Sequence, residues 1–199
     1  LAASFNSKWH ERIYYTENVI GIIKGNEYAN EYIAISAHYD HMGVEGTEIY
    51  NGADDDGSGT IAILLMAKAL AQAKASGVSF DKNFIFIGMS AEEKGLLGSR
   101  YYTNNPIVPL SRTCANLNID MIGRIDPTRK GKNRNYIYII GSDHDSQDLH
   151  NLSEKTNSET INMELDYRFN AKDDPNRFYY RSDHYNFARF GIPIIFYFS

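Results

Sequence analysis

The stretch KNFIFIGMS, Lys82–Ser90, is apolar at almost every position between its two ends. A strand with one face in water alternates apolar and polar residues, whereas a strand covered on both faces is apolar nearly throughout. We therefore predict a buried strand here. Helices are predicted on either side of it along the chain, at Ser58–Ala75 and at Lys94–Asn105, the second of which stops near Pro106.

The rest of the chain continues this alternation of strands and helices. Two predicted strands, Asn18–Gly25 and Glu31–Asp40, flank a polar turn. The remaining predicted elements are strands at Thr113–Gly123, Tyr136–Gly141 and Ile192–Ser199, and helices at Ser146–Asn157 and Ser182–Gly191. Without a repeat or a linker, this order predicts one α/β domain over residues 1–199, with a mostly parallel sheet and helices on both faces.

Composition excludes several classes of protein. The 199 residues are 43% hydrophobic, which is enough for a core and too much for a disordered chain. The net charge is −5 and no basic block occurs, which argues against a nucleic-acid partner. No apolar run reaches the length of about 18 residues that a membrane span needs. The single cysteine, Cys114, is expected to be an inert core thiol, and the opening LAASF, without Met or a signal peptide, is typical of a processed chain.

Reactive side chains follow the predicted strands at their carboxyl ends. His38 and Asp40 end one strand, the pair Glu92 and Glu93 follows the next, and Asp120 ends a third. The segment GADDDGSG, residues 52–59, puts three further carboxylates at the start of a helix. Ligands of open α/β sheets bind outside the carboxyl ends of the strands, so we expect these groups to converge.

Several carboxylates in one crevice require positive charge nearby. Lys and Arg are scarce near these motifs, with Lys94 and Arg181 as the candidate cations, so a pair of divalent metal ions is the better solution. One histidine with several carboxylates is a mixed nitrogen and oxygen ligand set that suits Zn²⁺ or Mn²⁺.

Each of these motifs also has an ordinary structural interpretation. The histidines of HYDH, residues 38–41, are by themselves more often surface or capping residues, and DDDG is most often a helix cap or turn. A Glu-Glu pair is usually a solvated pair. Asp120 is the least ordinary, because a carboxylate that ends an apolar strand is unfavourable unless it is paired or metal-bound. The SDH triplet at Ser182 is not a serine-protease triad, because adjacent residues cannot form that geometry and no GxSxG motif occurs.

Five segments taken together resemble the successive motifs of metallopeptidase family 28, the co-catalytic di-zinc aminopeptidases with relatives among carboxypeptidases and glutaminyl cyclases. The segments are AHYDHMG, NGADDDGSG, MSAEEKGLLGSR, NLNIDMIG and YRSDHYNFARFGIPIIFYF, and they cover nearly the whole chain in order. The resemblance implies the zinc-peptidase α/β sandwich with a central mixed sheet.

The resemblance also implies a role for each matching metal ligand. His38 and Asp120 match the ligands of one zinc ion, and Glu93 matches a ligand of the other. Asp55, the second of the three aspartates, matches the carboxylate that bridges the two ions. The cofactor implied is therefore Zn²⁺, with two ions in the intact enzyme.

Catalytic roles follow from the same resemblance. Glu92 matches the general base, and Asp40 matches the carboxylate that orients His38. The family often has a cis peptide bond between the bridging residue and the next one, here Asp56. Residues expected near the substrate pocket are Tyr101, Arg181 and His184.

One expected ligand is absent from the sequence. In the family, a histidine of a segment similar to YH-x-P-x-D-T follows the last strand, whereas this chain stops at FYFS, residues 196–199. We therefore expect a catalytic domain without its usual C-terminal segment and a site one ligand short. A less favoured alternative is that His184 or water fills the gap. Either way, weak metal binding or inactivity of this chain is expected.

The function implied is zinc-dependent release of N-terminal residues from peptides with a free amino terminus. Two alternatives stay open: a glutaminyl cyclase with a single zinc ion on the same fold, and a non-catalytic binding domain. The intact ADDDGSG and AEEKG motifs favour the peptidase, since a bridging aspartate suits two metal ions. The resemblance also suggests a secreted or periplasmic protein, whereas the preferred residue and the oligomeric state are not readable from the sequence.

Overall fold

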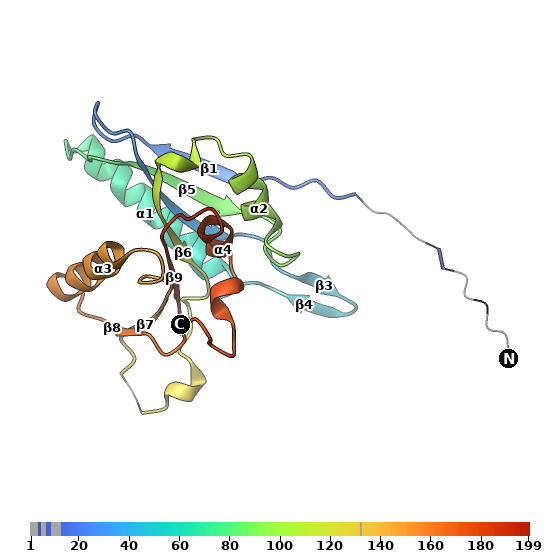
Figure 1. Ribbon diagram of the computed structural model, residues 1–199. Helices are drawn as coiled ribbons and strands as arrows, with labels where there is room; N and C mark the ends of the chain where they lie inside the picture. The colour runs from blue at the N-terminus through green and yellow to red at the C-terminus, as the bar shows by residue number, and fades with distance from the viewer. Residues whose placement is uncertain (1–3, 5–6, 9–12, 132) are drawn as a thin grey trace.

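A seven-stranded sheet forms the centre of the computed structural model, which describes residues 4, 7–8, 13–131 and 133–199 (Figure 1). Most of the LAASF segment, from which a processed terminus was expected, lies outside the described residues. The strands of this sheet are β1 (Val19–Ile23), β2 (Tyr32–His38), β5 (Asn83–Met89), β6 (Thr113–Ile119), β7 (Tyr136–Ile140), β8 (Glu164–Asp166) and β9 (Ile194–Phe198).

The strands lie in the order β1-β5-β2-β6-β9-β7-β8. Neighbouring strands are parallel except in the pairs β1–β5 and β7–β9, which are antiparallel. The prediction of a mixed, mostly parallel sheet is therefore confirmed. β1 and β2, which flank the polar turn, are nevertheless not neighbours, because β5 lies between them and pairs with both.

Helices cover both faces of the sheet, as predicted. Their bounds are α1 (Gly57–Ala75), α2 (Leu97–Asn104), α3 (Gln147–Glu159) and α4 (His184–Ala188), with short 3-10 helices at Leu110–Arg112, Pro127–Arg129 and Phe178–Tyr180. On one face, α1 and α3 border a common groove over β2 and β6. On the other face lie α2 and α4, which pack against each other and against the sheet.

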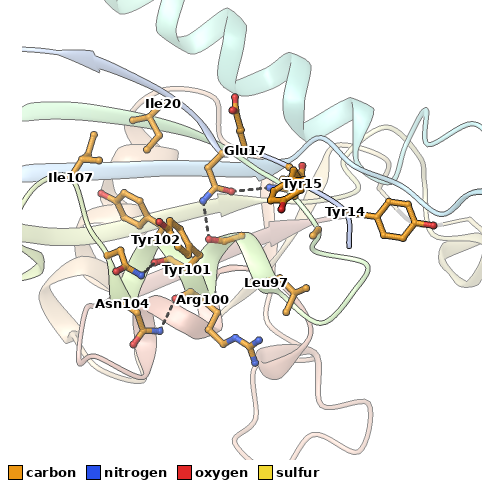
Figure 2. Close-up of a pocket in the computed structure, with 16 residues that line it drawn as sticks. Tyr14, Tyr15, Glu17, Ile20, Leu97, Arg100, Tyr101, Tyr102, Asn104 and Ile107 are labelled. Carbon is orange, nitrogen blue, oxygen red and sulfur yellow. Dashed lines mark hydrogen bonds between the residues drawn. The ribbon is translucent and has the colours of Figure 1, made fainter. Parts of the chain in front are cut away.

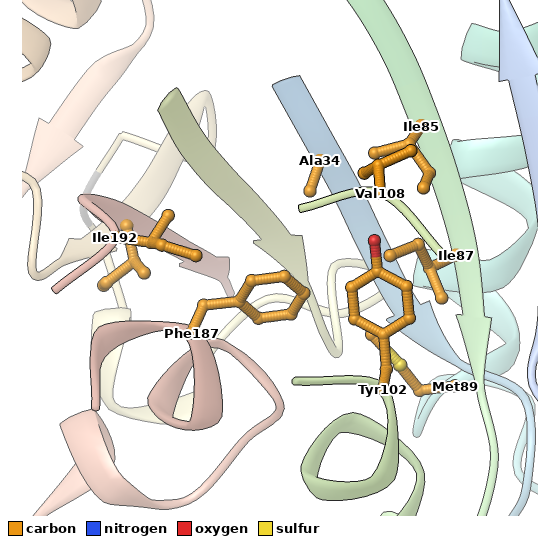
Figure 3. Packing of buried hydrophobic residues seen from close by; sticks show 9 residues of the cluster. Ala34, Ile85, Ile87, Met89, Tyr102, Val108, Phe187 and Ile192 are labelled. Carbon is orange, nitrogen blue, oxygen red and sulfur yellow. The ribbon is translucent and has the colours of Figure 1, made fainter. Parts of the chain in front are cut away.

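The core has one apolar cluster on each face. Figure 3 shows the cluster under α2 and α4, in which Tyr102 and Phe187 lie side by side and which also contains Ile85, Ile87 and Met89 of β5. The opposite cluster joins Ile63 of α1 to apolar side chains of β2, β5 and β6. Burial on both faces explains why β5 is apolar along its whole length, which is the pattern from which the fold was predicted.

A second, two-stranded sheet stands apart from the first. It is a hairpin of β3 (Gly43–Glu45) and β4 (Glu48–Tyr50), in which Gly43 pairs with Tyr50. All six strand residues of the hairpin are exposed. The hairpin was not predicted, because strands of three residues are too short for a periodic pattern. It links the end of β2 to the aspartates that precede α1.

No helix in the described part of the chain has both the length and the apolar character that crossing a membrane requires.

Candidate metal and catalytic site

The reactive side chains converge where β2, β5 and β6 end. These three strands are parallel neighbours, and His38 at the end of β2 is in register with Met89 at the end of β5. Asp120 follows the last residue of β6, while the Glu92–Glu93 turn comes shortly after β5. The predicted convergence of segments that are far apart in the sequence is therefore present in the structure.

The first group of side chains surrounds the imidazole of His38, which is only 1% exposed. Its Nε2 atom lies 3.1 Å from Asp55 Oδ1, 3.6 Å from Asp120 Oδ1 and 4.0 Å from Glu92 Oε2. The ligand atoms of His38, Glu92 and Asp120 all lie within 4.8 Å of one another.

A second group lies on the other side of Asp55. His41 Nδ1 is 2.7 Å from Glu93 Oε1 and 4.0 Å from Asp55 Oδ2. The ligand atoms of these three residues again lie within 4.8 Å of one another. Asp55 therefore directs one carboxylate oxygen to each group.

Unpaired polar atoms indicate what the two groups are suited to hold. His38 Nε2, Asp120 Oδ1, His41 Nδ1 and Glu93 Oε1 are buried, and none of them has a hydrogen-bond partner among the described residues. A buried polar atom without a partner is unfavourable by about 1–3 kcal/mol. Four such atoms, which face one another in pairs, fit a bound cation far better than they fit an ordinary polar core.

The electrostatics of the site also favour a cation. Burial raises the pKa of Glu92 to about 9, and the neighbouring carboxylates of Asp183, Asp120 and Glu93 add to this effect while His38 opposes it. Burial by itself lowers the pKa of His38, but the surrounding carboxylates outweigh it and raise that pKa well above its usual range. Among the residues that the structure describes, no Lys or Arg forms an ion pair with Asp55, Glu92, Glu93 or Asp120. Lys94 and Arg181, the cations considered from the sequence, are exposed.

The donor set suits zinc. Imidazole nitrogen and carboxylate oxygen are both common zinc ligands, and catalytic zinc sites use three protein ligands with one position left open. Each group supplies one histidine and at least two carboxylates.

The other two aspartates of GADDDGSG, Asp54 and Asp56, accept hydrogen bonds from backbone N–H groups and belong to neither ligand group. Asp56 caps α1, since its Oδ1 accepts hydrogen bonds from the N–H groups of Gly59 at 2.9 Å and of Met121 at 3.0 Å. Asp54 Oδ1 accepts one from the N–H of Gly123 at 2.7 Å. The two side chains therefore tie the start of α1 to the segment that follows β6. The peptide bond between Asp55 and Asp56 is cis, as the family resemblance suggested.

Asp40 links the end of β2 to the turn after β5, in addition to the expected contact with His38. Its carboxylate accepts hydrogen bonds from the N–H groups of Glu92 at 3.0 Å and of Glu93 at 3.3 Å. His38 Nδ1 lies 3.0 Å from the main-chain oxygen of Asp40 and 3.7 Å from its Oδ1. The closest partner of the imidazole is thus the Asp40 carbonyl, and the side chain chiefly holds the Glu92–Glu93 turn.

A chain of buried polar side chains supports Asp120. Ser182 Oγ donates a hydrogen bond of 2.8 Å to Asp120 Oδ2 and accepts one of 2.9 Å from Asn118 Nδ2. Ser36 Oγ in turn donates to Asn118 Oδ1 at 2.6 Å. Beside them, Asp183 is completely buried, and that burial raises its pKa to about 7.

Sequence reasoning assigned no part in the site to His41, Ser182 or Asp183. A sequence signal existed for His41, because a histidine three residues after a ligand histidine at a strand end is near the same crevice. Ser182 and Asp183 belong to the SDH triplet. The family resemblance of that segment placed it near the pocket but did not predict the hydrogen bonds of Ser182 to Asp120 and Asn118.

The predicted pocket residues lie outside both ligand groups. Tyr101 lines a groove of about 850 Å³ between α2 and residues 14–18, which Figure 2 shows. Arg181 is exposed beside Phe178, with its guanidinium carbon 5.2 Å from the ring centroid. His184 is completely buried, stacks on Phe196, and has its Nε2 2.8 Å from the carbonyl oxygen of Tyr179. His184 therefore lies in the core and belongs to neither ligand group.

Comparison with known proteins places the chain in a family. The model of peptidase family M28 matches residues 18–199. Aminopeptidase YwaD of Bacillus subtilis is 37% identical over 110 residues, which are 54% of this chain and 22% of that protein. The structure of BSAP, a zinc aminopeptidase from Bacillus subtilis, covers 91% of this chain with a TM-score of 0.64 and 29% identity.

The match covers only part of these relatives. The chain spans 39% of the BSAP structure and about a fifth of the curated relative's length. Glutaminyl cyclase of Porphyromonas gingivalis has the same fold, with a TM-score of 0.64, 22% identity, and coverage of 90% of this chain and 62% of that one.

Proposed function

Because the chain belongs to peptidase family M28, we propose that it carries the zinc-dependent catalytic centre of an aminopeptidase. The observation that carries the proposal is the pair of histidine–carboxylate groups on either side of Asp55, with unpaired buried atoms directed into each. The substrates proposed are peptides with a free amino terminus.

The ligands proposed for two zinc ions follow from these groups. His38 and Asp120 would hold one ion and Glu93 the other, while Asp55, which directs one oxygen to each group, would be shared between them. The distances from His38 Nε2 to Asp55 Oδ1 and from Asp55 Oδ2 to His41 Nδ1, 3.1 and 4.0 Å, support the bridging role. When bound, zinc supplies a Lewis acid that polarises the scissile carbonyl group and makes water acidic enough to attack near neutral pH.

Glu92 is the proposed general base. Its carboxylate lies beside His38 and is only 10% exposed, so it is shielded from bulk water but reaches the site. It takes a proton from the attacking water and passes a proton to the departing amine. Hydrogen bonds from the N–H groups of the Glu92–Glu93 turn to Asp40 fix the position of the base.

The experiment that tests this function is the substitution Glu92→Gln, assayed on leucine and alanine anilides. We expect the variant to lose at least about 100-fold in kcat, which is the lower end of the usual contribution of a general base, and to keep its bound zinc. The matched control is Glu159→Gln, whose side chain is 62% exposed at the end of α3. Unchanged turnover by Glu92→Gln would reject the assignment of the base.

The same assays separate the alternative functions. Two zinc ions with release of the N-terminal residue support the aminopeptidase. One zinc ion with cyclisation of an N-terminal glutamine identifies a glutaminyl cyclase, and neither metal nor turnover identifies a binding domain. The family resemblance also leads us to propose a secreted or periplasmic location, which fractionation of the native host tests directly.

A further inference from the structure

A row of buried polar side chains runs through the core toward Asp120, one of the proposed zinc ligands. The row forms a chain of four hydrogen bonds, in which each donor points toward Asp120. We propose that Asn118 is a positioning residue that sets the direction of this chain, so that the Ser182 hydroxyl donates its proton to Asp120 Oδ2. The proposal rests on the proposed function, since it takes Asp120 as a zinc ligand.

The two central strands place these side chains side by side. Ser36 of β2 and Asn118 of β6 are partners in the register of the two parallel strands. Successive side chains of a strand point to opposite faces of the sheet. Asn116 and Asn118 therefore share one face of β6, and Asp120 continues their row directly after the strand. The apolar residues between them belong to the cluster on the α1 side of the sheet.

Each bond of the chain has an ordinary length. Asn116 Nδ2 donates to Ser36 Oγ at 2.9 Å, and Ser36 Oγ donates to Asn118 Oδ1 at 2.6 Å. Asn118 Nδ2 donates to Ser182 Oγ at 2.9 Å, and that hydroxyl donates to Asp120 Oδ2 at 2.8 Å. Ser36, Asn116 and Asn118 are completely buried. Buried polar groups are unfavourable unless they are hydrogen-bonded, so this row is maintained by its own bonds.

The direction of the chain follows from the donors that each side chain offers. A serine hydroxyl has one proton, and the NH₂ group of an asparagine can only donate. Ser36 gives its proton to the Asn118 carbonyl, which turns the Asn118 NH₂ group toward Ser182. Ser182 must accept a hydrogen bond there, and its own proton is left for Asp120.

A reversed chain would have the opposite effect on the ligand. If the Asn118 amide were turned over, its carbonyl would accept the Ser182 proton, and the lone pairs of Ser182 would face the Asp120 carboxylate. Two acceptors that face each other repel, so the carboxylate would lose the bond that orients it. In the observed direction Oδ2 of Asp120 is held, while its Oδ1 has no hydrogen-bond partner in the described part of the chain and is available to a metal ion.

A double-mutant cycle tests whether Asn118 acts through Ser182. The variants are Asn118→Leu, which nearly keeps the size of the side chain, Ser182→Ala, and the two combined. Calorimetric titration of the chelator-treated chain with Zn²⁺ gives the affinity of each. We expect Asn118→Leu to weaken zinc binding about 10-fold, the lower end of the effect of a group that orients a metal ligand. In the Ser182→Ala background the same substitution should change the affinity by less than about 2-fold, because the residue through which it acts is already missing.

Co²⁺ in place of zinc gives a second readout, since the visible spectrum of bound cobalt depends on the geometry of its ligands. Asn118→Leu and Ser182→Ala should change this spectrum in the same way. The matched control is Asn83→Leu, because Asn83 is buried at the start of β5 and its amide binds main-chain groups of Gly25 and Ala29, away from the strand ends that form the site. The control should lose stability toward urea but keep the zinc affinity and the cobalt spectrum of the unchanged chain.

Several outcomes would overturn the proposal. Losses of affinity that add in the double variant would do so, and so would an unchanged zinc affinity in Asn118→Leu. If circular dichroism shows that Asn118→Leu is unfolded, Ser36→Ala replaces it in the cycle, because it removes the donor that orients the Asn118 amide, and the same outcomes decide. A chain that shows the expected coupling in zinc affinity but hydrolyses no peptide would support the role of Asn118 and reject the proposed function.

Discussion

Ser182 Oγ donates a hydrogen bond of 2.8 Å to Asp120 Oδ2, while Asp120 Oδ1 faces the His38 imidazole without a hydrogen-bond partner in the described residues. One oxygen of the carboxylate is therefore held by the protein and the other is left for a ligand. The hydroxyl of Ser182 fixes the rotation of Asp120 in the same way that outer groups orient the ligands of known metal sites.

The first prediction concerns this hydrogen bond. Ser182→Ala should weaken zinc binding about 10–100-fold, the usual effect of removing a group that orients a metal ligand. The chain should still fold, and calorimetric titration with Zn²⁺ gives the affinity. Ser158→Ala on α3 is the control, because its hydroxyl bonds only to a carbonyl oxygen of its own helix. Equal affinities of the two variants would show that Ser182 does not position Asp120.

The second prediction separates the roles of neighbouring aspartates. Asp56→Ala removes the acceptor of two N–H groups, at Gly59 and Met121, and should lower the free energy of unfolding by about 2–3 kcal/mol. Asp55→Asn should destabilise the metal-free chain less than Asp56→Ala does, because the Asp55 carboxylate faces His38 and His41 and holds no backbone N–H group.

Urea unfolding of both variants in the presence of a chelator measures this difference. In a zinc titration the order should be reversed: Asp55→Asn should lose more zinc affinity than Asp56→Ala, since it removes the carboxylate that both ligand groups share. If Asp56→Ala is as stable as the unchanged chain, the proposed structural role of Asp56 is wrong.

The third prediction concerns the start of α1. A Cβ atom at Gly59 would lie 2.6 Å from the main-chain oxygen of Ile119 and 2.5 Å from the Asp56 carboxylate. Gly59→Ala should therefore destabilise the chain by about 1–3 kcal/mol through crowding, even though alanine is the better helix former by about 1 kcal/mol. Thermal or urea unfolding measures the effect.

Gly21→Ala provides the control, because a Cβ atom there meets nothing within 4 Å. A Gly59→Ala chain that is more stable than the unchanged one would mean that α1 moves away from β6 easily, and that the approach of the two elements is not fixed.

The fourth prediction is that metal removal lowers thermal stability. A ligand that binds only the folded state at about 100 times its dissociation constant stabilises that state by about 2.7 kcal/mol. For a chain of 199 residues, this corresponds to about 5–10 °C in Tm between chelated and zinc-loaded protein. Differential scanning calorimetry checks the shift, and magnesium should not reproduce it, because Mg²⁺ prefers oxygen ligands alone. Identical Tm values with and without saturating zinc would contradict a metal site between His38 and Asp55.

Much of the fold could be predicted because its signals are local. The apolar run of β5 and the helix after GADDDGSG need only neighbouring residues to be recognised. The position of β5 between β1 and β2 could not be predicted, because strand order depends on contacts that no local pattern records. The three-residue strands β3, β4 and β8 were missed for a different reason, since they are shorter than the pattern that identifies a strand.

The candidate site divides in the same way. His38, Glu93 and Asp120 could be brought together in advance, because parallel neighbours end at the same edge of a sheet. The contact between His41 and Glu93 depends on the hairpin. The hydrogen bond between Ser182 and Asp120 joins the segment just before α4 to the end of β6. Such roles arise from side-chain geometry, which the sequence alone does not record.

The exposed hairpin has a consequence for how this protein can change. Its turn, residues 46–47, lies outside the seven-stranded sheet, and its strand residues are all exposed. Lengthening this turn or changing its residues alters the surroundings of the crevice without touching the cores on either face of the main sheet. The hairpin is therefore the natural place to graft a new substrate preference or an affinity tag, provided that the pairing of Gly43 with Tyr50 at its base is kept.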